Sequence, residues 1–352
     1  MSKASVPPPS GEGNREAVGA GRKAQTGGIL SRLKIDTYLL LIVSMVIAAS
    51  FLPARGEAAV GFGWATKVAI GLVFFLHGAR LSRVAVVGGL THWRLHLVVL
   101  GATYLLFPLL CLGIAALPAW ITPPALAGGI VFLGCLPSTI QSSIGFTVIA
   151  RGNVAAAVAA ASASNLLGIV LTPILVGLLL HAKGAISPGS AWAIVLQLLF
   201  PFVAGQLLRR WIGSWVSAHA KLVQIVDRGS ILLVVYTAFS SAVVGGVWSQ
   251  IGAMDLARLL VICSALLAAA LTTTFLAART LRFATPDEIA IVFCGSKKSL
   301  ASGVPMAGVL FPAATAGLAL LPLMLFHQIQ LMACAVIAQR YAKRADLDAV
   351  TG

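Results

Sequence analysis

The chain is a succession of long apolar runs separated by short polar stretches. Most runs approach the roughly 20 residues that a helix needs to cross the hydrocarbon of a bilayer. They are continuous and rich in Leu, Ala, Val and Gly, whereas the strands of a membrane barrel alternate over about ten residues. The pattern therefore predicts an all-α polytopic membrane protein with ten transmembrane helices. Their approximate limits are 36–53, 64–80, 96–117, 124–149, 153–180, 190–208, 229–248, 256–277, 286–312 and 318–339.

Polar residues gather before the first run and after the last. Residues 1–29 are rich in Gly and Pro and carry both signs of charge, so we expect a disordered cytoplasmic tail there. Residues 341–352 form a second predicted cytoplasmic tail. Between them we expect two five-helix halves, at residues 30–185 and 186–340.

Composition excludes several classes of protein. Charged residues make up 10% of the chain, against about 25% in soluble domains. The hydrophobic fraction is 59% and the mean hydropathy is +0.97. These values exclude a soluble enzyme, a disordered protein and a secreted disulfide scaffold. The 5 cysteines lie inside apolar runs without CxxC spacing, so we interpret them as core residues.

The net charge of +15 comes from 25 basic and 10 acidic residues. In a soluble chain such a balance would suggest a nucleic-acid partner. With ten spans and both termini in the cytoplasm, however, most basic residues fall on the cytoplasmic side, as the positive-inside rule requires. We therefore predict no nucleic-acid partner. Lys297 and Lys298 are exceptions, because they lie inside the ninth run.

A repeated pattern links the two halves of the chain. Residues 130–138 in the fourth run and 291–299 in the ninth share I-V-F-x-G-x-x-x-S without a gap. These are the fourth segments of two five-helix halves. Because five is odd, the halves would insert with opposite orientation, which is the inverted repeat of secondary transporters.

Each repeated segment, taken with the residues that follow it, contains residues that interrupt helices, such as Pro137 in the first and Pro305 in the second. The freed backbone groups cannot face lipid and must be buried or line a cavity, so a substrate site is indicated here. The alternative is a pair of Pro/Gly kinks packed by serine hydroxyls. Three further candidates lie in the fifth and tenth runs. The candidate substrate- and ion-binding residues are Pro137, Ser138, Thr139, Gln141, Ser142, Ser143, Asn165, Gly295, Ser296, Lys297, Lys298, Ser299, Ser302, His327 and Gln328.

Residues 137–143, 150–155 and 295–299 resemble motifs of the bile acid:sodium symporter family, specifically its symporter-like bacterial branch. The resemblance covers about residues 36–340. It implies a multi-pass protein of the bacterial inner (plasma) membrane. Helices one, two, six and seven would form a panel, and the others a core in which helices four and nine cross as broken helices. Substrate would bind between panel and core, which would rock to give alternating access.

The sequence departs from the family at its sodium ligands. The family's ninth-span Glu falls at about Phe293, and its Gln-Asn pair falls at Lys297 and Lys298. The Ser-Asn of the fourth span becomes Ser142 and Ser143. No acidic residue lies in the middle of a predicted span, although hard cations prefer oxygen ligands that include an anion. We therefore expect the usual sodium sites to be altered.

The two lysines are costly at this depth, at about 2.5–3.5 kcal/mol each on insertion scales. Adjacent helical residues point about 100° apart, so one lysine would enter the crevice while the other reaches a carbonyl at the break. We hypothesise that a lysine ammonium replaces a sodium ion, neutralising carbonyl ends or attracting an anionic substrate. The alternative is that both lysines extend into a cytoplasmic vestibule.

The function that these features indicate is secondary active transport of a small, anionic organic solute. Coupling to Na⁺, to H⁺ or to neither ion remains open, and no cofactor or resident metal is expected. The expected partners are the substrate and the lipid bilayer. The alternatives are a non-transporting membrane regulatory protein on the same fold and a sodium-coupled symporter with a rearranged ion site. An intramembrane enzyme is disfavoured, because the span centres lack carboxylates.

Overall fold

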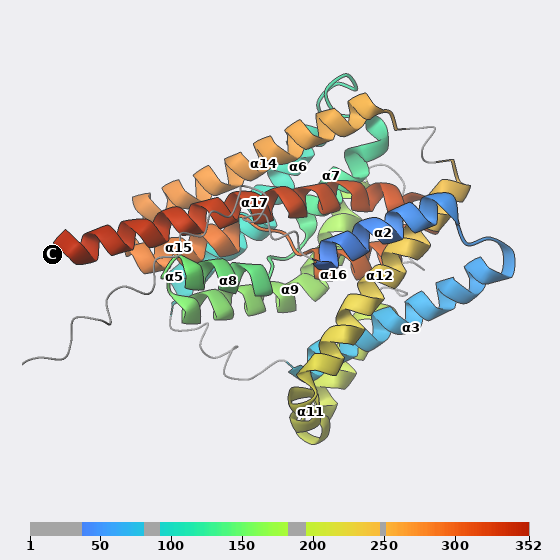
Figure 1. The fold of residues 1–352 in the computed structure, drawn as a ribbon, viewed down its shortest axis with the longest axis horizontal. Helices are drawn as coiled ribbons and strands as arrows, with labels where there is room; N and C mark the ends of the chain where they lie inside the picture. The colour runs from blue at the N-terminus through green and yellow to red at the C-terminus, as the bar shows by residue number, and fades with distance from the viewer. Residues whose placement is uncertain (1–36, 81–91, 182–194, 247–250, 352) are drawn as a thin grey trace, which may run out of the picture. The chain divides into compact units, whose positions relative to one another are not determined.

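The computed structural model describes residues 37–80, 92–181, 195–246 and 251–351, and these residues form helices and connecting segments without strands (Figure 1). The predicted tail at 1–29 and the predicted boundary at 185/186 lie outside the described residues. Residues 341–351 continue the last helix.

In chain order the elements are α2 (Thr37–Phe51), α3 (Gly56–Arg80), α5 (Trp93–Gly101), the π-helical turn η1 (Ala102–Leu106), α6 (Phe107–Ala115), α7 (Pro124–Cys135), α8 (Gln141–Ile149), α9 (Val154–His181), the π-helical turn η2 (Val195–Leu199), α11 (Phe200–Ala218), α12 (Ala220–Val244), α14 (Ala253–Thr280), α15 (Thr285–Gly295), α16 (Leu300–Leu310) and α17 (Ala313–Thr351).

Six helical segments among the described residues are long and apolar enough to cross a membrane. They confirm the predicted all-α, polytopic membrane protein. Two shorter apolar helices, Leu40–Phe51 and Pro124–Cys135, lie among them. The count of ten spans and their inverted arrangement stay predictions. The six segments are Gly56–Arg80, Trp93–Ala115, Val154–Leu180, Ala220–Val244, Ala253–Thr280 and Ala313–Arg344.

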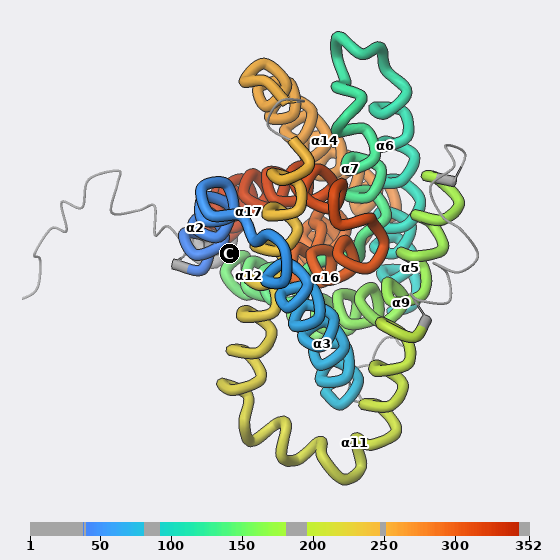
Figure 2. Tube along the Cα trace, turned by 90° about the vertical axis from the view of Figure 1, so that its right-hand side faces the viewer, coloured from blue at the N-terminus to red at the C-terminus, as the bar shows by residue number. Residues whose placement is uncertain are grey.

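Helix α3 packs against both α11 and α12 (Figure 2). The contact with α11 is made backbone to backbone at two glycines. A Cβ atom on Gly78 would overlap the carbonyl oxygen of Phe202, and one on Gly205 would overlap that of Phe75. Small residues let membrane helices approach closely, and the close approach supplies the van der Waals contact that holds them together in lipid.

Substituting Gly78 by valine should therefore separate α3 from α11. We expect a loss of about 3 kcal/mol in the free energy of unfolding, because the backbone of Phe202 cannot move aside as a side chain could. The measurement is thermal unfolding of the purified protein in detergent. Gly61→Val is the matched control in the same helix, since no atom lies within 4 Å of a Cβ built there. Equal effects of the two substitutions would contradict this packing.

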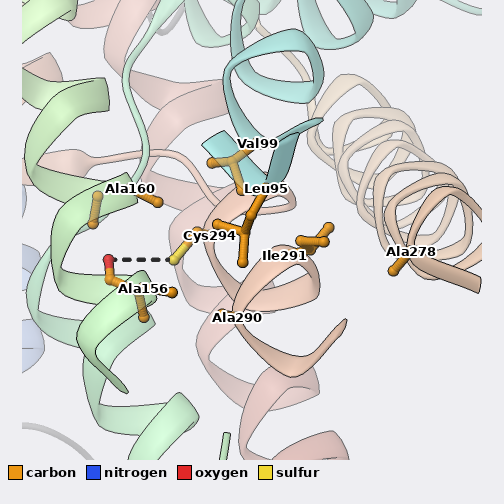
Figure 3. Packing of buried hydrophobic residues seen from close by; sticks show 10 residues of the cluster. Leu95, Val99, Ala156, Ala160, Ala278, Ala290, Ile291 and Cys294 are labelled. Carbon is orange, nitrogen blue, oxygen red and sulfur yellow. Dashed lines mark hydrogen bonds between the residues drawn. The ribbon is translucent and has the colours of Figure 1, made fainter. Parts of the chain in front are cut away.

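A second packed region joins α5, α9, α14 and α15 (Figure 3). Four alanines of α9 supply one side of it, and Leu95, Val99 and Ile291 fill the space opposite. The Cys294 thiol points at the carbonyl oxygen of Ala157, 3.7 Å away. The small α9 side chains let α15 approach closely, which positions the end of α15 beside the site described next. The α9 residues are Ala156, Ala157, Ala160 and Ala161.

Candidate functional site

Two helices are interrupted at equivalent points of the repeated pattern. The first break (residues 136–140) separates α7 from α8, and the second break (residues 296–299) separates α15 from α16. At the first break, Leu136 is extended at φ −75° and ψ 153°, as the residue before a proline tends to be. Pro137 therefore ends α7. The predicted interruption of both segments is confirmed. Pro305 does not cause the second one, however, because it lies inside α16.

The glycine shared by the two repeats has a packing role. Gly134 and Gly295 lie at the last residues of α7 and α15. A Cβ atom on Gly134 would lie 2.9 Å from Cys111 Cβ, and one on Gly295 would lie 2.9 Å from Thr274 Cγ2. Each glycine therefore lets the end of a broken helix pack closely against a neighbouring span.

The two breaks contact each other directly. The Ser299 backbone amide donates to the Pro137 carbonyl at 2.9 Å. In the other direction, the Ser143 hydroxyl donates to the Phe293 carbonyl at 2.9 Å, and the Ser138 hydroxyl donates to that of Cys294. Serines of the first break and of α8 thus satisfy carbonyl groups at the end of α15, which have no partner within their own helix.

The Lys298 side chain provides hydrogen-bond donors for carbonyl groups at the end of α7. This side chain is 0% exposed, and its ammonium group donates three hydrogen bonds of 2.7 Å to the carbonyls of Thr103, Gly134 and Leu136. An ammonium has three N–H donors, so all are used without solvent. The Nζ atom also lies 4.3 Å from the centre of the Phe107 ring. Lys298 is therefore a fully coordinated buried cation.

The carbonyls of the last three residues of α7 all have hydrogen-bond donors. The Leu133 carbonyl accepts from the Leu136 amide, and the Cys135 carbonyl accepts from the Thr172 hydroxyl at 2.8 Å. The carbonyls of Gly134 and Leu136 accept from Lys298. A helix C-terminus carries about half a negative charge. The ammonium of Lys298 therefore supplies both the missing donors and the opposite charge.

Gln330 of α17 fixes the backbone of Lys298. Its side-chain oxygen accepts from the Lys298 amide, and its nitrogen donates to the Lys298 carbonyl, both at 2.9 Å. The same nitrogen lies 2.8 Å from His327 Nδ1. These two bonds satisfy the backbone donor and acceptor of Lys298 at a residue that lies between two helices. The side chain of Gln330 therefore attaches the second break to α17.

Lys297 lies in different surroundings, although it is also 0% exposed. Its Nζ atom lies 4.5 Å from the centre of the Phe146 ring and 5.3 Å from that of Phe293. Within the described part of the chain, Nζ has no hydrogen-bond partner. A buried ammonium without hydrogen bonds is costly, and two ring contacts offset only part of that cost. Lys297 is thus a buried polar group that lacks a partner.

A polar network closes around the first break. The Asn165 side chain donates to the Ser138 carbonyl at 2.7 Å and accepts from the Ser302 hydroxyl at 2.7 Å. The Ser138 amide donates to the Ser164 hydroxyl at 3.0 Å. The network therefore joins α9 and α16 to the first break.

The structure brings most of the predicted site residues together. The Ser142 hydroxyl donates to that of Thr139, and the hydroxyls of Thr139 and Ser143 lie 2.8 Å apart. The side chains of the remaining candidates do not take part in the hydrogen bonds between the two breaks that are described above. The Ser296 hydroxyl bonds its own helix at Val292, and Ser299 caps α16 by accepting from the Ser302 amide. Gln141 is exposed at the start of α8, and Gln328 is half-buried on α17.

Some residues around the site were not among the predicted ones. The Thr103 carbonyl becomes available within the η1 turn, where the regular α-helical bonding pattern changes. Gln330, Phe107 and Phe146 also contact the lysines. A buried amide in an apolar span signals a polar partner, so Gln330 had a sequence signal. Pro108 was a signal for a free carbonyl in the preceding turn, because a proline has no backbone N–H.

Metal-binding and acidic groups are not part of this arrangement. Within the described ranges, no group of three or more His, Cys, Asp or Glu side chains could hold a metal ion. The buried carboxylate of Glu288 lies in the first turn of α15, where it pairs with Arg279 and accepts from the Tyr341 hydroxyl at 2.9 Å. The positive charges at the breaks are therefore balanced by helix ends and rings instead of carboxylates.

Comparison with known proteins identifies the family to which the chain belongs. The chain is 56% identical to Uncharacterized protein PA2026 of Pseudomonas aeruginosa over 88% of its length and 94% of that protein. It is 51% identical to Putative symporter YfeH of Escherichia coli over 89% of its length and 94% of that protein. Sodium/bile acid cotransporter 7-B of Xenopus laevis is 27% identical, over 88% and 92% of the respective chains. The model of the SBF-like CPA transporter family matches residues 36–343, and the chain belongs to this family of membrane transporters.

Proposed function

We propose that the protein is a secondary active transporter that moves a small, anionic organic solute by alternating access. A lysine ammonium takes the place of a bound coupling cation. Membership of the family makes the protein a transporter and not an enzyme. The observation that carries the finer proposal is the coordination of Lys298 by three carbonyl oxygens at a helix break.

Carbonyl groups at broken helices coordinate cations in transporters of this general kind. Here the oxygens of Thr103, Gly134 and Leu136 converge on one ammonium group instead. Since a tethered cation cannot dissociate, transport driven by sodium at this position would be lost. The protein would then transport solute with protons or without a coupling ion. A sodium-coupled symporter with a rearranged ion site is the alternative.

The anionic nature of the substrate is supported by the electrostatics of α8. The N-terminus of a helix attracts anions, and α8 begins at the first break with the exposed Gln141. Lys297 Nζ lies beside Phe146 of the same helix. An anion bound at the start of α8 would therefore lie about 1.4 helical turns from Phe146, beside which the Lys297 ammonium is buried.

The architecture that we propose has ten spans in two inverted halves, with both termini in the cytoplasm of a bacterial cell. The panel would comprise α2, α3, α11 and α12, and the core the remaining helices. The proposal is supported by the packing of α3 on α11 and α12, and by the reciprocal hydrogen bonds between the two breaks. Rocking of panel against core would expose the site to each side in turn.

Uptake into proteoliposomes tests this function. Purified protein would be supplied with a panel of radiolabelled organic anions under a sodium gradient, a pH gradient, both or neither. We expect uptake of at least one anion that responds to pH and does not respond to sodium. Uptake driven by sodium alone would contradict the proposed role of the lysines. Absence of uptake under every gradient would favour a membrane regulatory protein on the same fold.

A further inference from the structure

A pocket lies between α14 and α17, which run side by side (Figure 1). Its volume is about 280 Å³, and Phe275, Ile337, Arg340, Tyr341 and Arg344 line it. The four α17 residues follow helical spacing and so share one face of that helix. Two of the lining residues are cationic and none is acidic.

The pocket lies near the ends of two segments that are long and apolar enough to cross a membrane. The apolar segments Ala253–Thr280 and Ala313–Arg344 both end close to it. Phe275 and Ile337 lie farther from the ends of these segments than the two arginines do. In a bilayer the apolar wall would therefore face the hydrocarbon, and the charge would face the headgroup region. Arg340 and Arg344 are both exposed and stand one helical turn apart.

The other polar groups nearby are already engaged. Arg279 pairs with the buried Glu288 and lies over the Phe275 ring at 5.2 Å. The Tyr341 hydroxyl donates to Glu288. The negative charge of Glu288 is thus matched within the protein. The cationic groups that face the pocket are those of Arg340 and Arg344.

We propose that this pocket binds one anionic phospholipid, whose phosphate is held by Arg340 and Arg344 while an acyl chain covers Phe275 and Ile337. Guanidinium groups bind phosphate oxygens in a bidentate manner. Basic pockets between spans on the cytoplasmic side suit anionic headgroups, and the basic excess predicts that side for the end of α17. A free anion would use the two arginines but not the apolar wall.

Native mass spectrometry and thermal unfolding of the full chain in detergent test the site, with phosphatidylglycerol as probe. We expect one phosphatidylglycerol to be retained per protomer and to raise the unfolding temperature, whereas phosphatidylcholine does neither. The double variant Arg340→Gln, Arg344→Gln should bind about 30-fold more weakly, and Arg344→Gln alone about fivefold more weakly. The pair Arg210→Gln, Lys221→Gln removes two exposed charges elsewhere and should bind as the unmodified protein does.

Three results would overturn the proposal. Equal binding of phosphatidylcholine would show that charge is not recognised. Equal stabilisation by sn-glycerol 3-phosphate, which lacks acyl chains, would indicate a site for free anions. Unchanged binding by the double variant, with its fold verified by unfolding without lipid, would place the lipid elsewhere.

Discussion

Replacing Lys298 by alanine should cost about 4 kcal/mol or more in the free energy of unfolding. The substitution removes the three donors that satisfy the carbonyls of Thr103, Gly134 and Leu136. Each buried group left without a partner costs about 1–3 kcal/mol, and the truncated side chain leaves a cavity as well. Since whole proteins are stable by only about 5–15 kcal/mol, we expect a large fall in the unfolding temperature and loss of transport.

Lys298→Met separates the cost of the lost hydrogen bonds from the cost of the cavity. It keeps most of the side-chain volume and removes only the donors and the charge. We expect it to be less destabilised than Lys298→Ala, by the cavity contribution alone, and to remain well below the unmodified protein in stability. The matched control is Lys343→Ala, which removes an exposed lysine of α17. A Lys298→Met protein as stable as the unmodified one would show that the three hydrogen bonds do not hold the break.

Substitution of the neighbouring Lys297 should have the opposite effect on stability. Lys297→Met should raise the free energy of unfolding by about 1–2 kcal/mol, because Nζ lacks a hydrogen-bond partner and a thioether packs well against Phe146 and Phe293. The same substitution should abolish the response of uptake to a pH gradient. The reason is that Lys297, a buried amine without a hydrogen-bond partner, is the group that we propose to exchange a proton. Thermal unfolding and proteoliposome uptake measure the two effects.

Lys67→Met is the control for this prediction. Lys67 also lies over an aromatic ring, 4.8 Å from the centre of Trp64, but it is exposed. We expect neither stability nor uptake to change. If Lys297→Met or Lys297→Gln transported with unaltered pH dependence, Lys297 would have no part in coupling. A lower stability for Lys297→Met would mean that the ammonium has a favourable environment.

Much of the helical framework follows from local chemistry and could be predicted from sequence. The long apolar runs predicted membrane helices, and Pro137 predicted the end of α7, because a proline cannot continue the hydrogen bonds of a helix. The repeat I-V-F-x-G identified the two interrupted segments, and the close approaches at Gly134 and Gly295 explain the shared glycine. The ten-span inverted arrangement remains a prediction.

The partners of the two lysines could not be predicted, because they depend on backbone geometry that leaves no side-chain signal. Adjacent residues at a break do not keep the 100° separation of a helix, so sequence could not say which lysine meets the carbonyls. The Thr103 carbonyl is free to accept from Lys298 because in η1 the Phe107 amide donates to Ala102, and the next residue, Pro108, has no backbone N–H. Which carbonyl Pro108 leaves free depends on the η1 hydrogen-bond register, which the sequence does not define. Gln330 holds the second break, whereas Gln328, two residues earlier, lies half-buried without that role.

The central claim is that the Lys298 ammonium occupies the place of a bound cation, and a sodium titration of Lys298→Ala tests it most directly. Thermal unfolding would be recorded at increasing NaCl, with choline chloride at equal ionic strength as the reference. A ligand that binds only the folded state stabilises it as its concentration rises above Kd. We predict that sodium raises the unfolding temperature of Lys298→Ala, whose three carbonyls then lack a cation, and leaves the unmodified protein unchanged. A sodium response of equal size in the unmodified protein, or none in Lys298→Ala, would contradict the claim.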